Sequence, residues 1–238
     1  MRAGLVTVGG APALKPATMV ADGDPVHVVA PARRFASRGG DKLDAALIEF
    51  GVDPAGRSCL DAGASTGGFT DRLLRGGAAR VAAVDVGYGQ LAWEVRTDPR
   101  VTVLERTSVR DLVPGSLPFE PDLVAADLSF ISLRLVASVL VAVASVDAEF
   151  VLLVKPQFEA GPAGVGSGGV VRDPDEWARA IERVAASFAE VGAPSVGVMA
   201  SPLPGPAGNI EFFLHARRGS RAGPVDTGLA IEDGKRLR

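Results

Sequence analysis

Four charged residues from separate parts of the chain have the side-chain types that proton transfer in a buried cleft requires. Lys42 opens a predicted helix in SRGGDKLDAAL, and Glu211 lies in the apolar run NIEFFLHA. Asp127 and Lys155 come at the ends of the apolar runs DLVAAD and EFVLLVK. If a parallel sheet brings these ends together, two cations and two anions meet in one cleft. Such a cluster is costly to bury and suits removal of a proton from a weak acid.

The elements that must position these residues alternate between short apolar runs and helical patterns. The predicted strands are RSCLDAG, RVAAVDV, VTVLER, PDLVAADL, EFVLLVKP, PSVGVMAS and IEFFLHA, and the predicted helices cover 41–50, 69–75, 90–96, 131–144 and 174–191. This alternation predicts an α/β fold with a doubly wound, mostly parallel, Rossmann-like sheet. Only the turn-rich loop SPLPGPAGN separates the last two strands, so we expect them to be antiparallel neighbours.

Four segments are expected along the chain. Residues 1–29 form a small β-rich head that is too short for a core of its own, and 30–36 reads as a linker. The catalytic domain is expected over 37–218. The polar, glycine-containing tail over 219–238 is predicted to be disordered.

A glycine-containing loop, LDAGASTGGF, follows the first predicted strand of the catalytic domain and opens a helix. Glycine lets the backbone turn sharply and approach a ligand closely. One strand later, Asp85 is placed to accept hydrogen bonds from ribose hydroxyls. A tight structural turn explains many such loops, but the added Asp85 favours a ribose-bearing cofactor. Asp61 would repel a pyrophosphate and suits a cationic ligand, which favours S-adenosylmethionine over NAD.

Composition limits the remaining classes. The 238 residues are 47% hydrophobic, with Lys+Arg 25 against Asp+Glu 28, so a nucleic-acid partner needs a local basic patch. The single cysteine, Cys59, excludes an internal disulfide framework, and His27 and His215 lack metal-ligand spacing, so no metal site is expected. No apolar run reaches the roughly 20 residues of a membrane span, and no secretory signal is evident. We therefore expect a cytoplasmic protein.

Several strings together resemble the TlyA family of ribosomal-RNA ribose methyltransferases, which are also labelled hemolysins and share a catalytic fold with the FtsJ/RrmJ enzymes. They are SRGGDKL, LDAGASTGGFT, VDVGYGQLAW, ADLSFISL, LVKPQFE and SPLPGPAGNIEFFL. The resemblance implies a seven-stranded sheet with its last strand antiparallel, S-adenosylmethionine as donor, and 2′-O-methylation of cytidine in large-subunit, and in some members small-subunit, ribosomal RNA. The partners expected are ribosomal RNA or ribosomal subunits; no oligomeric state follows.

The same resemblance assigns roles to individual positions. The family's Lys-Asp-Lys-Glu tetrad falls on Lys42, Asp127, Lys155 and Glu211. We expect Lys155 to be the base, because a second ammonium group and a sulfonium nearby favour its neutral amine; ordinary surface ion pairs are the alternative. The expected cofactor contacts are Asp61, Gly63, Ser65, Thr66, Gly67, Gly68, Phe69, Asp85, Val86 and Asp127.

Two features depart from the family pattern. The head resembles only the second half of an S-four-like RNA-binding domain, without the preceding basic helices, so this sequence is either shortened or binds RNA by other means. The linker reads Arg-Arg-Phe-Ala at 33–36, where relatives often carry an Arg-Ala-Trp-Val-like segment. Candidate RNA contacts are therefore Arg33, Arg34, Arg38 and Lys15.

Two other function classes fit parts of the sequence. A NAD-dependent dehydrogenase would use the same sheet topology. The glycine loop of this chain does not suit that class, and neither does its four-residue charged cluster. A membrane-active hemolysin or a non-catalytic RNA-binding protein is the second alternative. Against membrane activity, the chain has no evident basic amphipathic helix.

Overall fold

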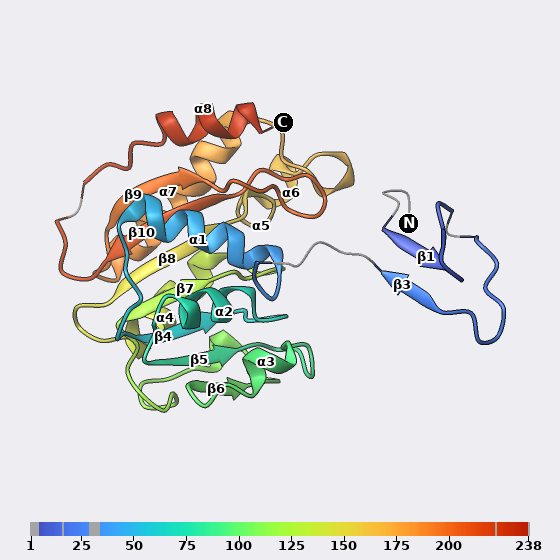
Figure 1. Ribbon diagram of the computed structural model, residues 1–238. Coiled ribbons are helices and arrows are strands. Elements are labelled where there is room, and N and C mark those ends of the chain that lie inside the picture. Colours follow the sequence, from blue (N-terminus) through green and yellow to red (C-terminus); the bar gives the residue numbers. More distant parts are fainter. Residues whose placement is uncertain (1–4, 16, 29–33, 222, 238) are drawn as a thin grey trace. The chain divides into compact units, whose positions relative to one another are not determined.

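The computed structural model describes residues 5–15, 17–28, 34–221 and 223–237. The chain divides into two compact units, Met1–Arg34 and Phe35–Arg238, and Figure 1 shows the elements of each. The smaller unit is an antiparallel sheet of β1 (Val6–Val8), β2 (Ala11–Pro12) and β3 (Val26–Val28) in the order β2-β1-β3. All three residues of β3 are exposed, in keeping with a unit too small to enclose a core.

A seven-stranded sheet forms the centre of the larger unit, in the order β6-β5-β4-β7-β8-β10-β9. Its strands are β4 (Ser58–Ala62), β5 (Arg80–Val84), β6 (Val101–Leu104), β7 (Leu123–Ala126), β8 (Glu149–Val154), β9 (Ser195–Ala200) and β10 (Phe212–Arg217). The first five pair in parallel, and β10 lies antiparallel between β8 and β9. The predicted doubly wound sheet and its antiparallel last strand are confirmed.

Helices cover both faces of this sheet (Figure 1). They are α1 (Arg38–Phe50), α2 (Gly68–Arg75), α3 (Trp93–Arg96), α4 (Ala137–Val143), α5 (Pro156–Glu159), α6 (Gly161–Gly164), α7 (Pro174–Glu190) and α8 (Gly228–Arg236), with short 3-10 turns η1 (Val109–Asp111), η2 (Leu133–Leu135) and η3 (Ser167–Gly169). Residues of α1, α2 and α3 share one apolar core with the sheet, and residues of α4, α7 and α8 share the other. Because both faces are buried, the strands read as near-continuous apolar runs.

Several predicted boundaries were wrong. The tail over 219–238 was expected to be disordered, but 228–236 form α8, which buries Ala230 and Ile231 in the core of one sheet face. The apolar residues are few, yet they fall on one side of the helix and find a partner surface. Of the predicted linker over 30–36, residues 30–33 lie outside the described part of the chain. At its end Phe35 is buried, and the backbone N–H of Ala36 donates to Asp71 at 2.8 Å.

Two predicted helices are also shorter than expected. The segment 90–96 is helical only over Trp93–Arg96, because Ala92 has a non-helical ψ of 142° and so the helix begins only after it. The segment 131–144 divides into η2 and α4. The Ser132 hydroxyl accepts a hydrogen bond from the backbone N–H of Arg134 and so begins η2 as a separate turn.

Candidate active site

The loop after β4 lies unusually close to the end of β7. Gly63 has φ 91°, and a Cβ at this position would come within 2.5 Å of the backbone oxygen of Asp127. Its N–H donates to the carbonyl of Val84 at 2.8 Å, which fixes the loop against the end of β5 as well. Only glycine fits this combination of left-handed backbone and close approach. The loop therefore forms a cradle of exposed backbone at the carboxyl ends of three neighbouring strands.

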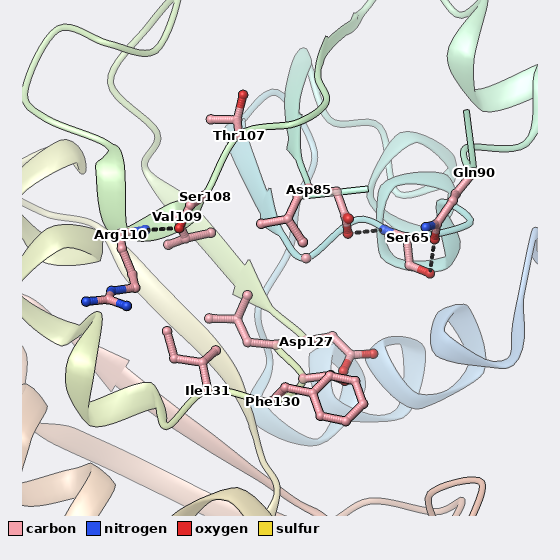
Figure 2. Close-up of a pocket in the computed structure, with 14 residues that line it drawn as sticks. Ser65, Asp85, Gln90, Thr107, Ser108, Val109, Arg110, Asp127, Phe130 and Ile131 are labelled. Carbon is pink, nitrogen blue, oxygen red and sulfur yellow. Dashed lines mark hydrogen bonds between the residues drawn. The ribbon is translucent and has the colours of Figure 1, made fainter. Parts of the chain in front are cut away.

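Asp85, which directly follows β5, organises the next part of the site. One of its carboxylate oxygens accepts from the N–H of Ser65 at 2.8 Å (Figure 2). The other accepts from the N–H of Gly87 at 2.6 Å. Each carboxylate oxygen has two lone pairs, so both keep capacity for a further donor. The side chain is thus held rigidly with free acceptor positions, as binding of a vicinal diol requires.

A cavity of about 450 Å³ opens between these groups, which is a usual size for a small-ligand site. Figure 2 shows its lining, to which the segments that follow β4, β5, β6 and β7 contribute. The lining residues are Gly63, Ser65, Asp85, Val86, Gln90, Thr107, Ser108, Val109, Arg110, Asp127, Leu128, Ser129, Phe130 and Ile131. Five of the expected cofactor contacts are among them. Thr66 is exposed on the loop, whereas Gly67, Gly68 and Phe69 form the buried start of α2 behind the cavity wall.

Asp61 lies beneath the cradle and is fully buried. The Thr70 hydroxyl donates to its Oδ2 at 2.6 Å, while Oδ1 is buried without a hydrogen-bond partner among the described residues. Burial raises the pKa of Asp61 to about 7, against the opposing hydrogen bond from Thr70, and the charge of Asp127 raises it further. A buried acceptor without a donor is unfavourable. A ligand with a cationic hydrogen-bond donor would supply the missing partner of Asp61 Oδ1.

Lys155 caps the amino end of α5, directly after β8, and its side chain is almost wholly buried. Its Nζ lies 2.6 Å from Oδ1 of Asp127 and donates to Oγ of Ser129 at 2.8 Å. Pro156 at the first helical position ends the strand here, because its ring fixes φ and its nitrogen has no hydrogen to donate. The ammonium group is therefore held by two oxygens at the end of β7, and both belong to residues that line the cavity.

Lys42 and Glu211 make a second, more deeply buried pair. The Nζ of Lys42 lies 2.5 Å from Oε2 of Glu211, and the two residues are 6% and 1% exposed. Lys42 comes from the second turn of α1, and Glu211 directly precedes β10. The loop before β10 packs against this carboxylate, because a Cβ on Gly205 would lie 2.6 Å from its Oε1.

Strand register brings the two pairs to one edge of the sheet. Phe212 pairs with Val154 across the antiparallel β8–β10 ladder. Glu211, which precedes Phe212, therefore lies opposite Lys155, which follows Val154. Asp127 likewise follows Ala126 at the end of β7. The structure therefore brings all four predicted residues together. Buried ion pairs of this kind are poor devices for stability, which makes a chemical role the better explanation.

The candidate RNA contacts are more scattered. Arg38 is an exposed residue at the start of α1, the helix that carries Lys42, and Arg34 is also exposed. Lys15 is an exposed residue of the smaller unit, and Arg33 lies outside the described residues. Nothing in this arrangement tests their role, so it stays a prediction. Within the described part of the chain, no group of His, Cys, Asp and Glu side chains could hold a metal ion.

Sequence reasoning missed Ser129, which supplies one of the two oxygens that hold Lys155. It also missed Phe130, whose φ of 63° is unusual for a bulky residue, and Arg110, which lines the far wall of the cavity. The one signal available was position, since Ser129 and Phe130 directly follow a predicted strand end that already carried Asp127.

Comparison with known proteins gives this geometry a family context. Residues 35–218 match the family model described as FtsJ-like methyltransferase. The chain is 58% identical over 216 residues to the 16S/23S rRNA (cytidine-2'-O)-methyltransferase TlyA of Mycobacterium tuberculosis, which covers 90% of this chain and 81% of that protein. It is 37% identical over 214 residues to Hemolysin A of Brachyspira hyodysenteriae, covering 90% of this chain and 89% of the other.

A solved structure described as a hemolysin of Streptococcus thermophilus superposes with a TM-score of 0.84 at 35% identity. The match covers 99% of this chain and 88% of that one. The similarity thus extends over both compact units and is not confined to the catalytic domain.

Proposed function

The chain belongs to the FtsJ-like methyltransferase family, and from this premise we propose that it transfers a methyl group from S-adenosylmethionine to the ribose 2′-hydroxyl of a cytidine in ribosomal RNA. Large-subunit RNA is the first expected substrate and small-subunit RNA the second. The observation that carries the proposal is the meeting of two buried lysine–carboxylate pairs beside a cavity that suits a nucleoside-bearing cofactor.

The cavity fits S-adenosylmethionine in three respects. The Gly63 cradle allows the ligand to approach the backbone, and Asp85 offers acceptors for the two ribose hydroxyls. Oδ1 of Asp61, which has no hydrogen-bond partner among the described residues, lies beneath the cradle and would suit the ammonium group of the methionine part. When bound, the cofactor supplies a methyl group already activated by a sulfonium. The protein then has to contribute alignment and a base.

Lys155 is the proposed base. In the arrangement described, its ammonium group is paired with Asp127, so it must lose a proton before it can accept one. The positive charge of a bound sulfonium would favour that loss. The proton of the 2′-hydroxyl then passes to Nζ of Lys155 while the methyl group moves to the 2′-oxygen. The ammonium group that forms is stabilised by its ion pair with Asp127 and by its hydrogen bond to Ser129.

Lys42 and Glu211 are proposed to support this step without receiving the proton. Glu211 fixes the Lys42 ammonium group, and the ordered pair holds α1 and the start of β10 at the sheet edge that also carries Lys155. Because the pair is almost inaccessible to water, its effect is weakly screened by salt.

For RNA binding, we propose that Arg38 at the start of α1 and Arg110 at the cavity wall contact RNA phosphates, and that Arg34 of the smaller unit is a separate candidate contact. Phosphate contacts of this kind supply affinity and register, while the pocket selects the ribose. The small β-rich head, with Lys15, is proposed as a partial S-four-like RNA-binding domain. Arg33 is retained as a candidate contact on sequence grounds alone.

A membrane-active role is the second candidate, because relatives carry hemolysin names. No helix in the described part of the chain is long and apolar enough to cross a membrane. Lysis of cells that persisted in a Lys155→Ala variant lacking methyl transfer would favour this second role.

The direct test supplies labelled S-adenosylmethionine and ribosomal subunits that lack the modification, followed by digestion of the RNA to nucleosides. The expected product is labelled 2′-O-methylcytidine, with no label on subunits that already carry the mark. Label on a base, or no label although the cofactor binds, would contradict the proposal.

A further inference from the structure

Two segments must keep a fixed spacing for the Lys155 site to exist. One is α5, which begins directly after Lys155. The other is residues 128–131, here called the pocket loop, which follows Asp127 and lines the cavity. The hydrogen bond from Lys155 to Ser129 spans these two segments. The position of the proposed base therefore depends on whatever joins α5 to the pocket loop.

Glu159, the last residue of α5, makes that connection. Its Oε2 accepts from the Ser132 hydroxyl at 2.5 Å, and its Oε1 accepts from the backbone N–H of Leu133 at 2.7 Å. Both donors directly follow the pocket loop. The carboxylate is 3% exposed, and the guanidinium of Arg134 is 3.6 Å away at the edge of the cluster.

The pocket loop needs such an anchor because it is strained. Phe130 has φ 63°, a left-handed conformation that is unfavourable for a bulky side chain. Its side chain is 91% exposed, and its ring lies 5.3 Å from that of Phe158, so burial in the core does not hold it in place. Strained conformations persist only where the surroundings impose them. Asp127 fixes the start of the loop and the Glu159 cluster fixes its end.

A structural role alone would not require a carboxylate here. Burial raises the pKa of Glu159, which is the sign of an ionised group held in an unfavourable environment. An apolar side chain of similar size would fill the space without that cost. A carboxylate instead offers two acceptors with fixed spacing, which suits it to hold a hydroxyl and a backbone N–H at once.

Building on the proposed function, we propose that Glu159 is a positioning residue that sets the distance between Lys155 and Ser129 by clamping the pocket loop to α5. It does not touch the reacting atoms. It acts through Ser132 and Leu133, and its loss leaves the lysine and its partners present but misaligned.

The test compares three variants of the full chain with the parent. Glu159→Ala removes the clamp. Glu159→Gln keeps the shape and one carbonyl oxygen for the Leu133 N–H. Glu149→Gln is the matched control, because Glu149 is also a largely buried, multiply hydrogen-bonded carboxylate but lies in the ion network of Arg57 and Arg217 at the first residue of β8.

For Glu159→Ala we expect kcat for methyl transfer to fall by about tenfold to a hundredfold with little change in the RNA KM, as misplacement of a reacting group produces. Cofactor affinity should fall by about threefold, because the pocket loop lines the cavity. Hydrogen exchange should speed up in the peptide over 128–133. Glu159→Gln should recover most of the rate, and Glu149→Gln should keep kcat and the exchange of that peptide unchanged.

Parent-like kcat and parent-like exchange over 128–133 in Glu159→Ala would overturn the inference. So would equal losses of rate in Glu159→Ala and Glu149→Gln, since that pattern reports general destabilisation. If the parent transfers no methyl group, the proposed function fails. The clamp is then still tested by hydrogen exchange, because faster exchange confined to Glu159→Ala supports it and unchanged exchange refutes it.

Discussion

The two ends of the seven-stranded sheet both carry charged clusters, but the clusters are built differently. At the amino ends of the parallel strands, Arg57 pairs with Asp122 and Glu149, and Glu149 also binds His215 and Arg217. Every charge there has a partner on a neighbouring element. At the carboxyl ends, Oδ1 of Asp61 has no partner among the described residues.

The pKa values follow this difference. Burial alone would raise the pKa of Glu149, but hydrogen bonds from Arg217, His215 and Arg57 outweigh it and lower the value to about 2. Burial raises the pKa of Asp61 to about 7, because a single hydroxyl donor does not compensate it. One end of the sheet is optimised for stability. The other end keeps a buried carboxylate oxygen of Asp61 without a donor among the described residues, which a ligand can supply.

The largest effect is expected when a buried charge at the carboxyl edge loses its partner. Glu211→Ala leaves the Lys42 ammonium group buried alone and should lower the free energy of unfolding by about 3–5 kcal/mol. The double variant Lys42→Met with Glu211→Leu should recover most of that stability, because an apolar pair removes both charges. Denaturant unfolding measures both.

The same double variant separates fold from chemistry. It should remain folded but transfer methyl groups far more slowly than the parent, since the ordered ion pair beside Lys155 is gone. A Glu211→Ala variant as stable as the parent would contradict the burial argument. A fully active double variant would show that this pair has no part in the reaction.

A smaller effect is expected at the amino end. Glu149→Gln should lower stability at pH 7 by about 2 kcal/mol, because its hydrogen bonds from the charged groups of Arg57 and Arg217 are weakened. The folded-state pKa of Glu149 is depressed from 4.5 to about 2, so its stabilisation is present above pH 4.5 and is lost as the pH falls toward 2. Acid titrations of unfolding should therefore be shallower for the variant in this window. Identical acid profiles would exclude the network as a source of stability.

The smallest effect is expected at Asp61, as a pH dependence of cofactor affinity. The pKa of Asp61 is raised from 3.8 to about 7, so its burial favours the folded state at low pH, and stability from this group declines between pH 4 and 7. A cationic ligand prefers the ionised form. Affinity for S-adenosylmethionine should then rise by up to about tenfold from pH 6 to pH 8. Calorimetry on the parent and Asp61→Asn checks this, since the variant should bind more weakly and lose the pH dependence.

Much of this site could be predicted from sequence because its residues sit where regular elements end. Asp127 and Lys155 close apolar runs, and strands with such runs place their carboxyl ends at one sheet edge. The glycine of the β4 loop and Asp85 were found by the same rule. These features depend on local pattern and on sheet topology, both of which the sequence expresses directly.

The residues that were missed depend on tertiary placement. Ser129 and Glu159 belong to segments without periodicity, and only the packing of α5 against the turn after the pocket loop gives them partners. Likewise, the polar composition of the tail hid the two apolar residues, Ala230 and Ile231, that dock α8. Composition averages over a segment, whereas docking needs only one apolar side.

The most direct test of the account measures methyl transfer to unmodified ribosomal subunits by the parent, Lys155→Met and Glu149→Gln, with cofactor affinity determined for each. If Lys155 is the base, Lys155→Met should bind the cofactor but lose about a thousandfold in rate, while Glu149→Gln should retain the parent rate. A Lys155→Met variant that transfers methyl groups at the parent rate would contradict the assignment of Lys155 as the base.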